Sequence, residues 1–161
     1  MTDITRQMPA PELDTTAWLN IPAPLKLSEL KGKIVVIHAF QMLCPGCVAE
    51  GIPQTCTIHQ LFADKGVQVI GLHTVFEHHE VMNLSALTAF VEEYRLPFPI
   101  AVDTPSTTGS IPLTMEKYQM QGTPTLIIID QQGQIRLNHF GRISDMKVGS
   151  LIGGLLRPSV R

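Results

Sequence analysis

The stretch IVVIHAFQMLCPGC, residues 34–47, decides the fold of this chain, because a short apolar run leads directly into two closely spaced cysteines. Residues 34–40 are rich in β-branched side chains and almost wholly apolar, which is typical of a strand covered on both faces of a sheet. Residues 44–47 then open a segment with an intermittent apolar face up to about Ala63, where we expect a helix. Because proline cannot donate a hydrogen bond to the preceding turn, we expect that helix to kink near Pro53.

Cys44, Pro45, Gly46 and Cys47 form a dithiol motif at the expected start of this helix. Their spacing brings both sulfurs to a helix end, where backbone N–H groups face a thiolate. The helix dipole favours an anionic sulfur there, so we expect a lowered pKa and a nucleophilic role for Cys44, the outer of the pair. Cys47 lies one turn deeper and is the expected resolving thiol. The pattern predicts a redox switch that works through a Cys44–Cys47 disulfide and needs no other cofactor.

The composition is compatible with one compact domain that folds without a disulfide. Of the 161 residues, 44% are hydrophobic and 16% are charged, which provides enough apolar material for a core. The net charge of −2 and the lack of a basic run argue against nucleic acid or an anionic membrane surface as a partner. No apolar run in the sequence is long enough to span a bilayer.

The N-terminal sequence and the cysteine count bear on the compartment. The first six residues, MTDITR, carry an acid where a secretory signal has basic residues, and no apolar segment follows. Three cysteines, an odd number, argue against a secreted disulfide framework. We therefore expect a cytoplasmic protein from the chain as it stands, and a periplasmic one if an export signal was removed.

The rest of the chain alternates expected strands and helices. Residues 1–24 contain four prolines and predict an extended N-terminal segment, with a short hairpin at 14–20, ahead of a domain spanning 25–161. This order of elements indicates an α/β fold with a mixed sheet. Further strands are expected at 67–72, 100–102, 125–130 and 134–140, and helices at 83–94, 115–119 and 144–156.

Three segments, taken in order with the dithiol, resemble the redoxin branch of the thioredoxin fold. Leu30–Ile37 carries a Lys-Gly-Lys lead-in, Leu96–Asp103 is similar to a segment that this branch inserts, and Gly122–Thr125 is similar to its cis-proline loop. This branch contains TlpA-type thiol-disulfide oxidoreductases and, more distantly, the alkyl hydroperoxide reductase and thiol-specific antioxidant family. The resemblance covers about residues 9–156 and implies a thioredoxin-like α/β fold, with a central mixed β-sheet flanked by helices on both faces.

The resemblance also implies supporting roles around the dithiol. A cis bond before Pro124 would present the backbone of Thr123 to an extended stretch of a partner protein. His38, six residues before the dithiol, stands where the family usually carries Asp, Asn or Glu and is a candidate to move the proton of Cys47; a core histidine satisfied by a hydrogen bond is the alternative. Glu50 aligns with an acid of TlpA-type helices, and a solvated helix residue is its alternative.

The implied reaction is thiol exchange with a protein disulfide or a small thiol, with regeneration by an upstream electron donor. The sequence departs from the family at Leu43, where Trp is usual, at Pro53, which is displaced by one, and in the inverted order of Pro45 and Gly46. Because the residues between the cysteines help to set the redox potential, the direction of electron flow stays open.

Two other functions match part of the pattern. A thiol-dependent peroxidase is disfavoured, because peroxiredoxins carry Thr three residues before the reactive cysteine, where this chain has Gln41 or Cys44. A non-catalytic metal- or partner-binding module is the second alternative, although Sco-like copper carriers space their cysteines by three residues, unlike this chain. One cysteine pair and the distant Cys56 fall short of the four ligands that zinc or an iron-sulfur cluster usually takes.

Cys56 and a histidine-rich stretch are the remaining chemistry-bearing features. Cys56 falls on roughly the opposite helix face from Cys47 and is expected to be a buried small hydrophobe, with a second resolving thiol as the alternative. After the strand at 67–72 we expect a solvated loop whose histidines and acids match no closed metal motif. These residues are His73, Glu77, His78, His79 and Glu80.

Overall fold

The computed structural model describes residues 8–158 and shows a seven-stranded mixed sheet in the order β1-β7-β6-β3-β4-β5-β2. The central strand β3 runs parallel to β4 and antiparallel to β6, and β4 runs parallel to β5. The expected α/β fold with a mixed sheet is confirmed. The strands are β1 (Met8–Pro9), β2 (Thr15–Leu19), β3 (Ile34–Phe40), β4 (Val67–His73), β5 (Ile100–Asp103), β6 (Thr125–Ile129) and β7 (Gln134–Phe140).

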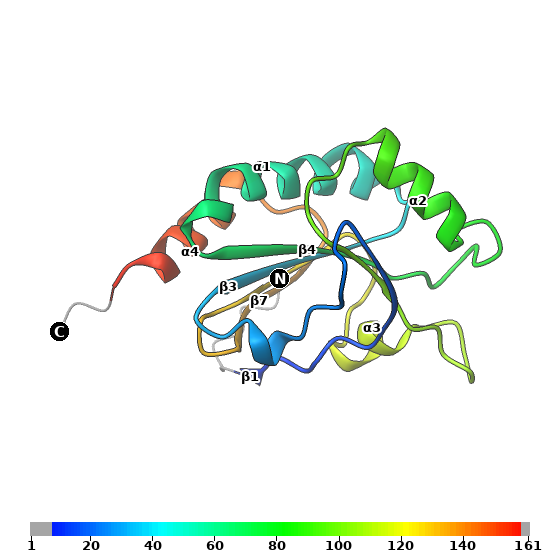
Figure 1. Cartoon of the computed structure of the whole chain (residues 1–161), viewed down its shortest axis with the longest axis horizontal. Helices are drawn as coiled ribbons and strands as arrows, with labels where there is room; N and C mark the ends of the chain where they lie inside the picture. The colour runs from blue at the N-terminus through cyan, green and yellow to red at the C-terminus, as the bar shows by residue number, and fades with distance from the viewer. Residues whose placement is uncertain (1–7, 159–161) are drawn as a thin grey trace.

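Helices cover both faces of this sheet (Figure 1). The helices α1, α2 and α4 lie on one face, and the short helix α3 lies on the other. Asn83 caps α2 and Ser144 caps α4. The side-chain oxygen of each accepts a hydrogen bond from a backbone N–H in the first turn of its helix. The helical segments are η1 (Leu27–Glu29), η2 (Cys47–Gly51), α1 (Ile52–Phe62), η3 (Ala63–Lys65), α2 (Leu84–Glu93), α3 (Leu113–Lys117) and α4 (Asp145–Leu156).

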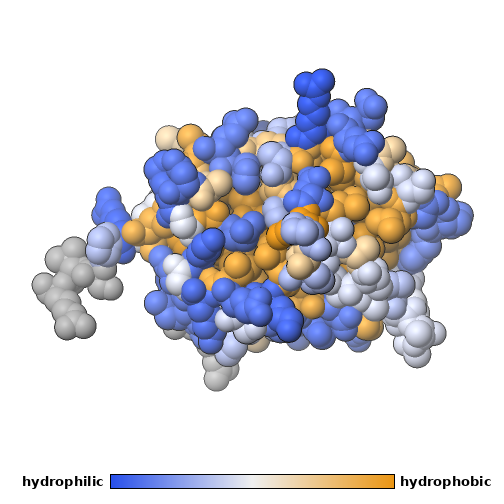
Figure 2. Space-filling view, in the orientation of Figure 1, coloured by the Kyte–Doolittle hydropathy of each residue, from blue (hydrophilic) through white to orange (hydrophobic). Residues whose placement is uncertain are grey.

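The strand β3 divides the core into two layers. Because side chains alternate along a strand, Val36 and Phe40 pack toward α1, α2 and α4, whereas Val35 and Ile37 pack toward α3 and the N-terminal segment. Every residue of β3 is buried, as expected for a strand covered on both faces. Figure 2 shows that some apolar surface remains across the middle of the viewed face, between hydrophilic side chains.

The helix after the dithiol differs from the expected kinked α-helix. Its first part, η2, is a π-helical turn in which the backbone N–H of Ile52 bonds to the carbonyl of Cys47, and regular α-helix begins only at α1. Pro53 therefore lies in the first turn of α1, a position at which an α-helix tolerates a residue without an N–H. The irregularity is a wider turn before the proline, and such turns are frequent at functional sites.

The prediction of a hairpin at 14–20 is wrong. β2 pairs with β5 in antiparallel fashion, with Trp18 opposite Ala101, while β1 pairs with β7 at the other edge of the sheet. The chain leaves β2 at Asn20, which has a left-handed φ of 63° and whose amide donates to the carbonyls of Leu96 and Phe98. Residues 8–19, the part of the expected N-terminal segment that forms strands, thus supply both edges of the sheet.

The packing around Gly71 generates a stability prediction. A Cβ at this buried position in β4 would lie 2.6 Å from Cδ1 of Ile100 and 3.1 Å from the ring of Phe98. We expect Gly71→Val to lower the free energy of unfolding by about 2 kcal/mol, because overpacking a full core forces its neighbours to move. Gly149→Ala is the matched control: no atom lies within 4 Å of its added Cβ, and alanine is favoured in a helix. Equal urea midpoints for the two variants would contradict the packing argument.

Candidate active site

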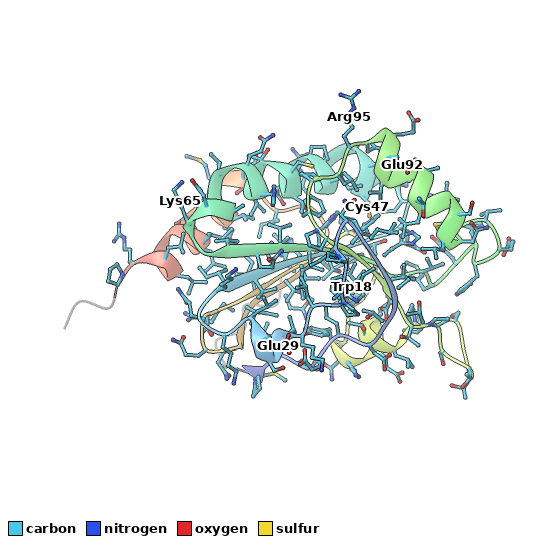
Figure 3. All side chains as sticks on the ribbon, viewed as in Figure 1. Trp18, Glu29, Cys47, Lys65, Glu92 and Arg95 are labelled. Atoms are coloured by element: carbon cyan, nitrogen blue, oxygen red, sulfur yellow. The ribbon has the colours of Figure 1, made fainter. Side chains whose placement is uncertain are left out.

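The end of β3 delivers the two cysteines to one edge of the sheet. Both are free thiols, and their sulfurs lie 2.6 Å apart without a bond between them. The backbone N–H of Cys47 donates to Sγ of Cys44 at 3.3 Å. Figure 3 shows Cys47 between the helical layer and the sheet, at the opposite end of α1 from Lys65. The arrangement can close into a disulfide with a small movement of either sulfur.

The two sulfurs differ in their access to solvent. Cys44 is half-buried, whereas Cys47 is fully buried. Burial, together with a hydrogen bond to Cys44, raises the pKa of Cys47 to about 12, and hydrogen bonds from the backbone of Gln41 and the side chain of Thr123 act in the opposite direction. The sulfur of Cys44 is therefore accessible from outside, whereas the thiol of Cys47 is hard to deprotonate.

The cis-proline loop lies directly against the dithiol. The Thr123–Pro124 peptide bond is cis, as the sequence predicted, and the carbonyl of Thr123 accepts from Sγ of Cys44 at 3.5 Å. A Cβ on Gly46 would lie 3.5 Å from the ring of Pro124. The loop is held by a hydrogen bond of 2.8 Å from the N–H of Gly141 to the carbonyl of Pro124. The expected cis-proline loop and dithiol are therefore in contact.

His38 faces the helix that follows the dithiol. Only 2% of its surface is exposed, its ring stacks on Phe40 at 5.7 Å, and its Nε2 has no hydrogen-bond partner. Burial lowers the pKa of His38 to about 4, so the ring is neutral at ordinary pH. A Cβ on Gly51 would lie 2.4 Å from Nε2, which shows that the imidazole occupies the space of a side chain at that position. Both roles considered for His38, acceptor of the Cys47 proton and core histidine, stay predictions.

A groove of about 470 Å³ connects His38 to the dithiol edge. Gly46 and Pro124 line it beside the cysteines, and residues of the β7–α4 turn close the other side. Glu50 lies on its rim with 47% of the side chain exposed, paired with the more exposed Arg142 at 3.3 Å. An ion pair this exposed contributes little to stability, so Glu50 is a solvated helix residue, the alternative named for it.

The remaining candidates lie apart from one another. Cys56 is half-buried against the α1 core, and burial raises its pKa, so it packs as a small hydrophobe. The grouping of His73 with the exposed His78 and His79 in one loop is wrong, because β4 continues to His73, which is 1% exposed. Among residues 8–158, no group of three or more His, Cys, Asp or Glu side chains is arranged to hold a metal ion.

Gln41 is a further polar residue of the site. Its position before Cys44 counts against a peroxidase, but its side chain is also 1% exposed and hydrogen-bonded on both sides. A polar residue that directly follows a fully buried strand is the signal that could have pointed to it, because a buried amide needs partners.

Comparison with known proteins gives consistent matches. The sequence model of the Redoxin family matches residues 5–148. A crystallised thioredoxin-like superfamily protein is 49% identical with a TM-score of 0.91, covering 96% of this chain and 99% of that one. A thiol-disulfide isomerase from Corynebacterium glutamicum is 48% identical with a TM-score of 0.89, covering 94% and 97% of the two chains.

Among curated proteins, Protein DipZ of Mycobacterium bovis is 32% identical over 82% of this chain. The chain spans only 18% of the length of that relative. Within residues 8–158, every helix is too short or too polar to cross a membrane.

The two buried histidines generate a prediction for stability against pH. Burial lowers the pKa of His38 and of His73 to about 4 in the folded protein, whereas an unfolded chain titrates near 6.5. As the pH falls from 6.5 toward 4, the unfolded state binds protons that the folded state does not, so the free energy of unfolding decreases by up to about 3 kcal/mol per histidine. Urea unfolding at several pH values measures this slope. We expect His38→Leu to remove about half of it, and an unchanged slope would contradict the assignment.

Proposed function

The chain belongs to the Redoxin family, and from that membership we propose that it is a thiol-disulfide oxidoreductase that exchanges its Cys44–Cys47 dithiol with a disulfide of a partner protein. The observation that best supports this proposal is the pair of free sulfurs 2.6 Å apart, one half-exposed and one buried, beside a cis-proline loop. The isomerase that is 48% identical over nearly the whole chain supports the same reaction class.

The exchange consists of two sulfur displacements. The thiolate of Cys44 attacks one sulfur of the partner disulfide, whose S–S bond breaks, and the other partner sulfur leaves as a thiolate. Cys47 then loses its proton and attacks Sγ of Cys44, which forms the Cys44–Cys47 disulfide and releases the second partner thiolate. The partner gains two electrons and the dithiol loses two. We propose that an upstream dithiol donor restores the reduced pair, and that no further cofactor takes part.

The contacts at the dithiol support the division of roles. The exposed surface of Cys44 and the N–H of Cys47 aimed at its sulfur favour Cys44 as the attacking group. Thr123 and Pro124 supply the docking edge for an extended partner segment, since the carbonyl of Thr123 already lies 3.5 Å from Sγ of Cys44. A partner strand bonded there would hold its own sulfur close to the nucleophile.

His38 is the proposed acceptor for the proton of Cys47. It is a buried, neutral imidazole next to Gly51 of the dithiol helix, and its Nε2 is unpartnered. Because His38 lines the same groove as Gly46 and Pro124, we propose that water in that groove carries the proton of Cys47 to the imidazole.

A peroxidase is the weaker candidate. The position three residues before Cys44 holds Gln41, whose side-chain oxygen accepts from the N–H of Phe76 at 3.1 Å and whose amide donates to Glu77 at 3.4 Å. Its amide lacks the hydroxyl that peroxiredoxins place there, and it is already engaged.

The proposed reaction predicts a clear separation between the two cysteine variants. With dithiothreitol as reductant, the wild-type protein should accelerate the reduction of insulin, and Cys44→Ser should abolish that acceleration because the attacking sulfur is lost. Cys47→Ser should still attack but remain bound to its partner as a mixed disulfide, detectable on a non-reducing gel. Catalytic consumption of hydrogen peroxide with insulin untouched would instead support the peroxidase.

The role of His38 predicts a selective kinetic defect. His38→Leu keeps the bulk but cannot accept a proton, so release from the mixed disulfide should slow by on the order of 100-fold. Alkylation of Cys44 by iodoacetamide should stay near the wild-type rate, because that step does not use Cys47. Equal release rates for the folded variant and the wild type across pH 6 to 9 would return His38 to the status of a core residue.

A further inference from the structure

The turn between β3 and the dithiol has no regular structure, yet it sets the position of both cysteines. Residues 41–44 form it, and one hydrogen bond inside it runs from the N–H of Cys44 to the carbonyl of Gln41 at 3.1 Å. A turn joined by so few internal bonds needs external contacts to hold one conformation. Those contacts come from the neighbouring strand β4 and the loop that follows it.

His73 makes the first of these contacts. It is the last residue of β4, lies opposite Phe40 in the register, and packs its ring against that phenylalanine at 5.2 Å. Its Nε2 accepts a hydrogen bond from the backbone N–H of Met42 at 3.3 Å. Because an acceptor nitrogen carries no proton, the remaining proton of the neutral ring is on Nδ1.

Gln41 makes the second set. Its side chain is tied to Phe76 and Glu77, both in the loop after β4. The side chain of Gln41 and the backbone N–H of Met42 are thus both bonded to β4 or to the loop after it. The backbone of Gln41 also bonds to the sulfur of Cys47. Rotation of this turn would move Cys44. It would also move the backbone of Gln41 and its bond to that sulfur.

We propose that His73 is a positioning residue, which uses its bond to the N–H of Met42 to hold the turn in the conformation that aligns Cys47 with Cys44. This inference rests on the proposed dithiol exchange and acts on its second step. In that step the sulfur of Cys47 must reach Sγ of Cys44 as the partner thiolate leaves. The resolving attack is intramolecular, so its rate depends on how well the turn holds the two sulfurs in the reacting geometry.

A matched pair of substitutions separates the hydrogen bond from simple packing. His73→Leu keeps an apolar side chain against Phe40 but offers no acceptor to Met42. His73→Gln carries an amide oxygen that can take the place of Nε2. A role limited to packing would be preserved by leucine, whereas a positioning role through Met42 would be restored only by glutamine.

Ellman's reagent resolves the two steps in one measurement. With one equivalent of this aromatic disulfide and the reduced protein, attack by Cys44 releases a first thionitrobenzoate, and attack by Cys47 on the mixed disulfide releases a second. We expect His73→Leu to slow the second phase about fivefold, the effect of losing one hydrogen bond in the reacting geometry. His73→Gln should return it to within about twofold of wild type.

The control and a second variant keep the test decisive. His79→Leu removes a histidine of the loop after β4 whose ring nitrogen bonds to the backbone carbonyl of Ser110 at 3.3 Å, away from the turn at 41–44, and it should leave both phases unchanged. If His73→Leu does not fold, Gln41→Met releases the same turn from its side-chain contacts and should slow the second phase likewise. A wild-type second phase in folded His73→Leu, or an equal loss in His73→Gln, would overturn the positioning role. Failure of the wild type to reduce insulin would instead refute the proposed function itself.

Discussion

The burial of β3 at the centre of the sheet is the constraint on which the site depends. Its neighbours β4 and β6 hold it on both sides, and α1 and α3 cover its two faces. The end of β3, the end of β4 and the start of β6 therefore meet at one edge, which brings together the dithiol, His73 and the cis-proline loop. Each of these groups follows or begins a strand whose position the core already determines, so the site is preorganised by the sheet.

Burial also gives the interior groups of the site a common electrostatic state. The pKa of Cys47 is raised, and the pKa values of His38 and His73 are lowered, in each case mainly because a charge in this layer would lose its hydration. All three are consequently neutral at ordinary pH. Cys44 is half-exposed and stands outside this set. In the proposed exchange, the proton of Cys47 passes to a neutral base or to the groove.

The parts of the structure with strong local signals were predictable from the sequence. The apolar run of β3 and the helices expected at 83–94 and 144–156 depend on residues close in the chain, and the structure contains them as β3, α2 and α4. The pairing of β2 with β5 was missed, because strand partners distant in sequence leave no local trace. The buried state of His73 was missed for the same reason, since its acceptor role depends on a peptide group of another strand's turn.

The short strand β1 has a consequence for how the sheet ends. An edge strand normally presents a row of free N–H and C=O groups that can pair with a second chain and extend the sheet from molecule to molecule. Here β1 covers only the first part of β7, and it consists of Met8 and Pro9, the second of which has no N–H to offer. At the start of β7, the outer strand of the sheet thus lacks one of the donors that a further strand would need, which makes this part of the edge a poor template for the addition of a second chain.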